Sequence, residues 1–364
     1  MKSQTQVKSK PLTYMPQATQ VKKLNVKPVI GKTLGVLSDR NSTILARRHG
    51  IGTGGERQTL EKIGGAYNIT RERVRQIEEA SYLKIRNSAE YEFLTPAFDE
   101  INNYLNEHCG VVSEEVLVET LASDAHRPYL SLLLALNDSF VKIKESDDFQ
   151  ASWAVNKESA EKVKVLLTGI VESMEKTGEP IDAEELMVKA EEANREFLPV
   201  TEDNLHILLG ASKKIELGPF NQWGLAEWPQ ITPRGVRDKV FLVLHRHGDP
   251  LHFRELAHRI DDAPFRFKNS KKTHPQTVHN ELIKDERFVL IGRGIYALAN
   301  WGYMPGTVKD VIMNILKEEG KPVEREVLVD RVMDQRKVQK NTILLNLQNR
   351  THFKKDEGNK YYLA

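Results

Sequence analysis

The segment TLEKIGGAYNITRERVRQIEEASYLKIR, residues 59–86, has the pattern of two short helices joined by a tight turn. Apolar residues recur along it at the spacing that places them on one face of each helix. These predicted core positions are Leu60, Ile63 and Tyr67 in the first helix and Val74, Ile77, Ser81 and Ile85 in the second. Asn68 and Ile69 fall at the turn, and the hydroxyl of Thr70 can cap the second helix. The segment therefore predicts a helix-turn-helix.

The outward face of the second helix combines basic, acidic and amide side chains, namely Arg71, Glu72, Arg75, Gln76 and Glu79. In a major groove Arg can pair with guanine, Gln with adenine, and Glu can accept from the amino group of cytosine. A purely electrostatic phosphate binder gains nothing from a carboxylate that faces DNA, so the mixture favours base reading. Charge pairing on a solvated helix explains the same composition equally well, and both interpretations stay open.

Residues 37–86 closely resemble region 4 of sigma-70-type sigma factors, because LARRHGIG, TLEKIG and TRERVRQIE follow one another in that order. In that family, region 4 binds the −35 element of promoters and sits on the flap of the RNA polymerase β subunit. The resemblance implies base contacts by Arg71, Glu72, Arg75 and Gln76. It also implies positions near the DNA phosphates for Arg48, Arg57, Thr59, Leu60, Glu61 and Arg73. Leu60 and Glu61 would act there through main-chain amides at the helix start.

A second pattern begins after Pro96 and repeats four times. Gly110, Gly178, Gly248 and Gly320 each close a helical stretch and precede a short apolar link into another helix. Glycine supplies the left-handed residue that ends a helix, and the proline that follows three of these glycines within two residues prevents continuation. A third helical stretch and a pair of strands complete each repeat, which is the order of a winged helix.

We therefore expect a mainly α-helical protein with small β-hairpin wings, in which a helix-turn-helix domain is followed by tandem winged helices. The expected units are a flexible basic arm at 1–35, the sigma region 4-like domain at 36–92, and winged helices at 97–156, 157–231, 232–304 and 305–364.

Residues 232–303, with PLHFREL and GRGIYALANW, resemble the HARE-HTH winged helix, a module of the RNA polymerase delta subunit and of restriction and chromatin proteins. The resemblance implies association with nucleic acid or polymerase. From the residues alone, the candidate secondary DNA contacts are Lys268, Lys271, Lys272, His279, Asn280, Lys284 and Arg293. Solvated surface charge is the equally weighted alternative.

Charge is distributed unevenly along the chain. Residues 1–35 hold seven lysines and no acidic residue, and residues 232–364 carry a net charge of +8. Residues 91–231 hold eleven basic and twenty-seven acidic residues, a net charge of −16. Basic stretches indicate a polyanionic partner, here double-stranded DNA, whereas the acidic stretch should repel phosphates. We expect the acidic winged helices to bind basic protein surfaces or to serve only as packing scaffolds.

Several functional classes are excluded at this level. There is no apolar run of the roughly 18 residues that span a membrane and no signal peptide, so we expect a cytoplasmic, nucleoid-associated protein without a membrane partner. Cys109, the only cysteine, is expected to be buried, and the histidines near Gly248 are not spaced to converge, so no metal or other cofactor is expected. No phosphate loop, nucleophile elbow or carboxylate pair appears, so neither a small-molecule substrate nor enzymatic activity is expected.

Two functions fit these features. The first is a transcription factor or RNA polymerase accessory protein that reads promoter-like duplex DNA and docks on the polymerase core through the β flap. A Lys-rich arm precedes residue 37 where a sigma factor has its promoter-melting region, so we expect an accessory factor and not a complete sigma factor. The alternative is a non-catalytic adaptor that brings a separate enzyme of a restriction or DNA-processing system to DNA.

Overall fold

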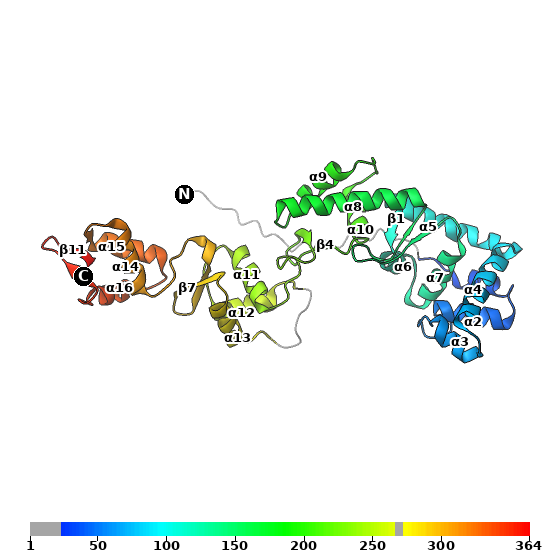
Figure 1. Cartoon of the computed structure of the whole chain (residues 1–364), viewed down its shortest axis with the longest axis horizontal. Helices are drawn as coiled ribbons and strands as arrows, with labels where there is room; N and C mark the ends of the chain where they lie inside the picture. The colour runs from blue at the N-terminus through cyan, green and yellow to red at the C-terminus, as the bar shows by residue number, and fades with distance from the viewer. Residues whose placement is uncertain (1–22, 266–271) are drawn as a thin grey trace. The chain divides into compact units, whose positions relative to one another are not determined.

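The computed structural model describes residues 23–265 and 272–364, which form two units divided between Glu227 and Trp228 (Figure 1). Helices dominate both units, and the sheets are small and antiparallel, which confirms the expected fold class. Lys268 and Lys271, two of the candidate DNA contacts, lie outside the described residues. None of the helices in the described part of the chain combines the length and the apolar composition that spanning a membrane requires.

The first unit begins with the helix-turn-helix domain. Its elements are α1 (Lys27–Leu34), α2 (Asp39–His49), α3 (Leu60–Tyr67), α4 (Arg71–Arg86) and the 3-10 helix η1 (Ala89–Leu94). Ile44, Ile63 and Val74 are fully buried at its centre, with Leu60, Tyr67 and Ile77 packed around them as the periodicity predicts.

The turn between α3 and α4 fits closely against a glycine. Asn68 adopts the left-handed conformation with φ 51°, and the amide of Ile69 donates to the carbonyl oxygen of Gly64 at 3.0 Å. A Cβ on Gly64 would lie 2.6 Å from the carbonyl oxygen of Ile69. The Thr70 hydroxyl accepts from the amide of Arg73 at 3.2 Å, so the predicted cap of α4 is confirmed.

The expectation of an unfolded arm through residue 35 is wrong for its last part. Residues 27–34 form α1, and Ile30 and Leu34 on this helix are buried together with Leu24 and Val26 before it. The amide of Leu24 also donates to the carbonyl oxygen of Leu121 in the next module at 2.8 Å. The stretch contains lysines but has enough apolar residues to fold once a partner surface covers them.

Four modules with one order of elements follow. The first contains α5 (Thr95–Glu107), β1 (Val111–Ser113), α6 (Glu114–Leu121), η2 (Asp124–His126), α7 (Arg127–Leu136), β2 (Val141–Ile143) and β3 (Ser152–Ala154). Its strands lie in the order β1-β3-β2, all antiparallel. Trp153 in the central strand β3 pairs with Val112 of β1 on one side and with Lys142 of β2 on the other. The free thiol of Cys109, just before β1, is buried as expected.

The second module, which ends the first unit, contains α8 (Lys157–Thr177), α9 (Ala183–Ala193), α10 (Glu202–Leu209), β4 (Ile215–Leu217) and β5 (Trp223–Leu225). A bridge between Ile181 and Trp223 takes the place of its first strand. Its buried Asn204 donates from Nδ2 to the carbonyl oxygen of Glu107 at 3.3 Å, which ties the second module to the first.

The second unit contains two further modules. The third comprises α11 (Val236–His247), β6 (Leu251–His252), α12 (Phe253–Asp262), α13 (Pro275–Lys284), β7 (Phe288–Gly292), β8 (Ile295–Leu298) and η3 (Ala299–Trp301). The fourth comprises α14 (Val308–Glu319), β9 (Val323–Glu324), α15 (Arg325–Gln335), α16 (Lys340–Leu347), β10 (Phe353–Lys355) and β11 (Lys360–Leu363). The four repeated glycines all have positive φ, between 62° and 80°.

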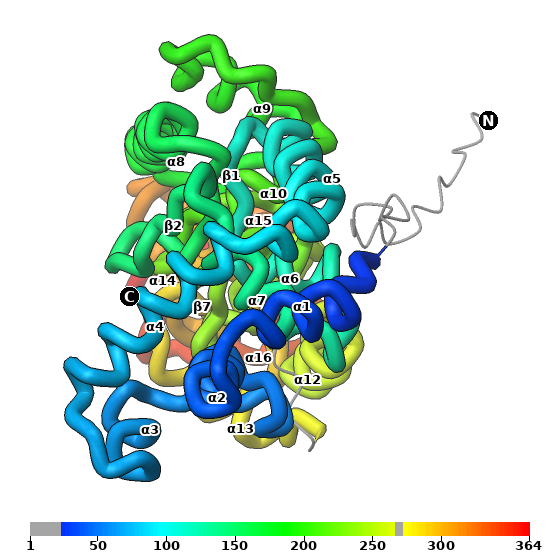
Figure 2. The backbone as a smooth tube through the Cα atoms, turned by 90° about the vertical axis from the view of Figure 1, so that its right-hand side faces the viewer, coloured from blue at the N-terminus to red at the C-terminus, as the bar shows by residue number. Residues whose placement is uncertain are grey.

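The helix-turn-helix domain is packed onto the first module through α7. This helix contacts α1, α2 and α4, and Figure 2 shows α1 running alongside it. Leu45 and Ile85 share one buried cluster with Leu130 and Leu133 of α7. Because α7 connects both domains through a continuous core, the first module holds the helix-turn-helix domain in a fixed position.

Polar contacts inside this interface centre on His49 at the end of α2. Its Nδ1 lies 2.9 Å from the Ser131 hydroxyl, and its Nε2 lies 2.8 Å from the Tyr82 hydroxyl. Arg86 of α4 donates to the carbonyl oxygens of Ala135 and Leu136, the last residues of α7, at 3.0 and 2.9 Å. These hydrogen bonds provide partners for the buried His49 ring and for the carbonyl oxygens at the end of α7, which have no partner within the helix.

Gly64→Ala should disrupt the turn, whereas Gly65→Ala should be tolerated. The new methyl group at position 64 meets a backbone oxygen at 2.6 Å, whereas a Cβ at position 65 meets nothing within 4 Å. Alanine favours a helix interior over glycine by about 0.5–1 kcal/mol, so the variant at 65 should melt at the same or a higher temperature than the wild type. Thermal unfolding of the full chain measures both. Equal melting temperatures for the two variants would contradict the described turn.

Acidification should loosen the contact between α2 and α7. Burial, followed by Arg57, Arg48 and Lys142, lowers the pKa of His49 from 6.5 to about 3. The unfolded chain thus takes up this proton near pH 6.5 and the folded chain only near pH 3. The contribution of the neutral His49 ring to the free energy of unfolding is fully present above pH 6.5. Below pH 6.5 the free energy of unfolding falls by up to about 1.4 kcal/mol per pH unit.

Hydrogen exchange of the α2 and α7 amides between pH 7 and pH 5, corrected for intrinsic rates, measures this loss. Carboxylates ordinarily titrate below this range, and comparison with a variant that lacks the His49 ring separates its contribution from that of other histidines. His49→Gln keeps a polar side chain and removes the titration, so it should flatten the pH dependence. The same slope in both proteins would show that His49 does not link folding to pH.

Candidate nucleic-acid interface

Helix α4 turns one face to solvent along its first two turns. Arg71, Glu72, Arg73, Arg75 and Gln76, all predicted DNA contacts, are exposed. Val74, Ser81 and Ile85 on the opposite face are buried. The structure thus brings the predicted base-reading side chains together on one accessible surface of a helix held in place from behind.

Ion pairs order the charged side chains on this face. Arg75 pairs with Glu72 at 2.6 Å and also with Glu79. The hydrogen bond from Arg75 lowers the pKa of Glu72, so its carboxylate stays ionised at neutral pH. Exposed pairs of this kind contribute little to stability, so Arg75 can exchange them for contacts with a base.

The start of α3 lies next to the start of α4, because Arg71 and Glu61 form an ion pair at 3.1 Å. The Thr59 hydroxyl caps α3 by accepting from the amide of Lys62 at 3.2 Å. The amides of Leu60 and Glu61 precede the first bond within the helix and point out of its end, where an anion can bind. This geometry suits the phosphate contact that the resemblance implies for residues 59–61.

The structure gives Arg48 internal partners that the sequence did not predict. Its Nε pairs with Glu78 of α4 at 3.3 Å, and its Nη1 donates to the carbonyl oxygen of Gln58 at 2.6 Å. The guanidinium therefore joins α2, the loop before α3 and α4, and is less available for a phosphate than expected. Arg57 is half-exposed but pairs with Glu114 of the first winged module at 2.8 Å. Nothing in the sequence identified Glu78 or Glu114 as partners, because both lie far away along the chain.

The candidate contacts in the third module differ in their exposure. Lys272, Asn280, Lys284 and Arg293 are exposed, with Arg293 at the tip of the β7–β8 hairpin, as predicted. His279 is half-buried: its Nδ1 lies 3.1 Å from the Tyr296 hydroxyl, and its ring packs on Phe253. His279 thus takes part in the packing of the module, and its contact with DNA stays a prediction.

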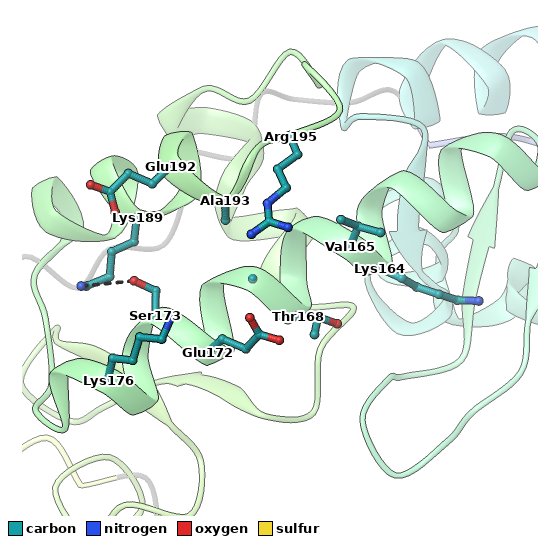
Figure 3. A pocket seen from close by; sticks show the side chains of 11 residues that line it. Lys164, Val165, Thr168, Glu172, Ser173, Lys176, Lys189, Glu192, Ala193 and Arg195 are labelled. Atoms are coloured by element: carbon teal, nitrogen blue, oxygen red, sulfur yellow. Dashed lines mark hydrogen bonds between the residues drawn. The ribbon is translucent and has the colours of Figure 1, made fainter.

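The third helix of the first acidic module offers no surface for DNA comparable to that of α4. Leu130, Leu132, Leu133 and Leu134 of α7, the third helix of the first module, are all buried, so this helix cannot enter a groove. A groove of about 410 Å³ lies between α8 and α9, with Glu172 and Arg195 pointing into it (Figure 3). Its lining holds four basic side chains, Lys164, Lys176, Lys189 and Arg195, and two acidic ones, Glu172 and Glu192. Within the described ranges, no three His, Cys, Asp or Glu side chains are grouped as metal ligands.

Comparison with known proteins matches two segments of the chain to families. Residues 33–87 match the family described as Sigma-70, region 4. Residues 236–301 match the HARE-HTH family, whose description includes the words "ASXL, restriction endonuclease HTH domain". Both are DNA-binding, non-catalytic domains.

Curated relatives of the first segment are sigma factors. The chain is 41% identical over 68 residues to RNA polymerase sigma factor SigA of Nostoc sp., 19% of this chain and 17% of that protein. It is 43% identical over 56 residues to RNA polymerase principal sigma factor HrdD of Streptomyces griseus, 15% of this chain and 17% of that protein. The match to each spans less than a fifth of the relative's length. The chain thus carries a sigma-70 region 4 sequence and a HARE-HTH sequence, which support a DNA-binding, transcription-related role.

Proposed function

We propose that this protein is a transcription factor or RNA polymerase accessory protein that reads −35-type duplex DNA through α4. The observation that carries the proposal is the exposed combination of Arg71, Glu72, Arg75 and Gln76 on α4. These residue types can distinguish base pairs in a major groove, and a carboxylate among them is of no use to a general phosphate binder.

The phosphate contacts would come from the start of α3. The capped end at Thr59, the outward amides of Leu60 and Glu61, and the exposed Arg73 surround the beginning of α4. Backbone contacts of this kind fix the register of a recognition helix without reading sequence. The basic second unit would add a weaker, salt-sensitive contact through Lys272, Lys284 and Arg293.

Docking on the RNA polymerase core, at the β flap, is the second part of the proposal and rests on the sigma factor relatives. The chain would act beside a sigma factor and compete with that factor's own region 4, without catalysis of its own. The first acidic module would serve as the scaffold that fixes the helix-turn-helix domain, because its helix α7 is buried against that domain.

A non-catalytic adaptor of a restriction or DNA-processing system is the other candidate. It is favoured by the HARE-HTH match, whose family description includes restriction endonucleases. Affinity purification followed by mass spectrometry separates the two functions. Polymerase subunits support the accessory factor, whereas a nuclease or methyltransferase partner supports the adaptor.

Glu72→Ala should relax the base preference of the protein, whereas Glu79→Ala should not. Both carboxylates are exposed and both pair with Arg75, so the two variants lose the same charge and the same kind of ion pair. Only Glu72 is expected to contact a base, which is worth about 1–3 kcal/mol of discrimination. Selection from a randomised duplex library, followed by affinity measurements on single-base variants of the selected site, gives the preference. If both variants changed affinity equally for every sequence, Glu72 would not read a base.

A further inference from the structure

Glu114, the first residue of α6, lies between two cations from different modules. Its Oε1 is 2.8 Å from Nη2 of Arg57, and its Oε2 is 2.7 Å from Nζ of Lys142. Arg57 belongs to the loop before α3, and Lys142 belongs to β2 in the wing of the first module. The Glu114 side chain is 18% exposed, whereas those of Arg57 and Lys142 are 48% and 44% exposed. Each carboxylate oxygen therefore holds one cation that also faces solvent.

Other contacts hold the Lys142 side chain and the backbone next to Arg57. Lys142 lies over the ring of the buried Trp153, with 5.2 Å between Nζ and the ring centroid. The residue after Arg57 is fixed by two bonds, because Gln58 donates from its amide to the carbonyl oxygen of Arg47 and accepts from Arg48. The ring of Trp153 thus holds Lys142 independently of Glu114, whereas the Arg57 guanidinium extends from a fixed backbone and is held by Glu114.

Positive charge dominates this place. Arg57, Arg48 and Lys142 lower the pKa of the nearby His49 and Glu114 raises it, while Arg48 is itself paired with Glu78. Burial favours the neutral form of Glu114, but the hydrogen bonds from Lys142 and Arg57 outweigh it and lower its pKa, so the carboxylate is ionised. A phosphodiester also presents charged oxygens to such donors and can form the same charge-assisted bonds.

We propose that Arg57 and Lys142 form a phosphate site of the duplex-binding surface, which the Glu114 carboxylate occupies in the absence of DNA. The proposal rests on the proposed function, because Arg57 lies two residues before the Thr59 cap of α3. Residues 91–231 are acidic as a whole, yet the wing offers a cation here. Of the three wing carboxylates, Glu145 and Asp148 pair with Lys213 and Lys214 at 2.5 and 2.8 Å, and Asp147 is exposed.

Two consequences follow for DNA binding. The wing of the first module extends the phosphate contacts beyond the helix-turn-helix, and Glu114 weakens them because DNA has to displace it. Since a phosphate contact carries no base information, both effects are independent of sequence. Glu114 therefore lowers the affinity for all duplexes alike, while α4 determines the preference for particular base sequences.

Glu114→Gln in the full chain should tighten binding to every duplex alike, by about three- to tenfold at 0.1 M salt. The slope of log affinity against log salt should stay close to that of the wild type, because both proteins make the same two phosphate contacts and each contact contributes about 0.9 to the slope. Glu115→Gln is the matched control, because this exposed neighbour removes the same charge from the same helix turn. Fluorescence anisotropy with a labelled duplex over a salt series measures both. Equal affinities for the two variants would overturn the proposal.

Lys142→Ala gives an independent readout if Glu114→Gln loosens the fold. It should weaken binding to all sequences and flatten the salt slope by about one, whereas Lys176→Ala, an exposed lysine on α8, should do neither. If Lys142→Ala behaved like Lys176→Ala, Lys142 would not contact phosphate and the site would be refuted. Absence of binding by the wild-type chain at low salt would refute the proposed function itself, so the two failures are distinguishable.

Discussion

Helix α7 packs its leucines against α1, α2 and α4 on one side and against its own winged module on the other. The helix-turn-helix domain is therefore not a separate body on a tether but one end of a continuous core. Burial of several leucines, each worth about 1.5–3 kcal/mol, holds it there, and His49 and Arg86 satisfy the polar groups enclosed in the interface. The surface left open is the one that carries the charged side chains of α4, so packing determines which face can meet DNA.

Features that depend on local spacing could be predicted from the sequence. The turn at Asn68, the Thr70 cap, the buried face of α4 and the left-handed glycines of the repeats all follow from residue type and periodicity. Partners that lie far apart along the chain could not be predicted. Arg48 forms an ion pair with Glu78, Arg57 forms one with Glu114, and α1 folds because apolar residues from distant parts of the chain cover it. The candidate base-reading residues were found because they need only exposure on one helix, whereas the surroundings of the arginines depend on tertiary contacts.

The modules also show how one fold takes different roles through its third helix. In the first module this helix, α7, is apolar and buried, and serves as an internal packing surface. In the third module, the corresponding helix α13 buries only Val278 and Leu282 and keeps Gln276, Asn280 and Lys284 exposed. The order of elements is shared, but function depends on which side chains remain at the surface. The charge of each stretch follows the same division, acidic in residues 91–231 and basic in residues 232–364.

The central claim is that the surface formed by the start of α3 and the first turns of α4 is the duplex-binding face. Photo-cross-linking of the full chain to a selected duplex, followed by mass spectrometric mapping of the attached peptides, tests it most directly. The account predicts cross-links within residues 57–79, with the strongest at 71–76. Cross-links confined to residues 232–364, with none in 57–79, would contradict it and would make the basic second unit the DNA-binding part of the chain.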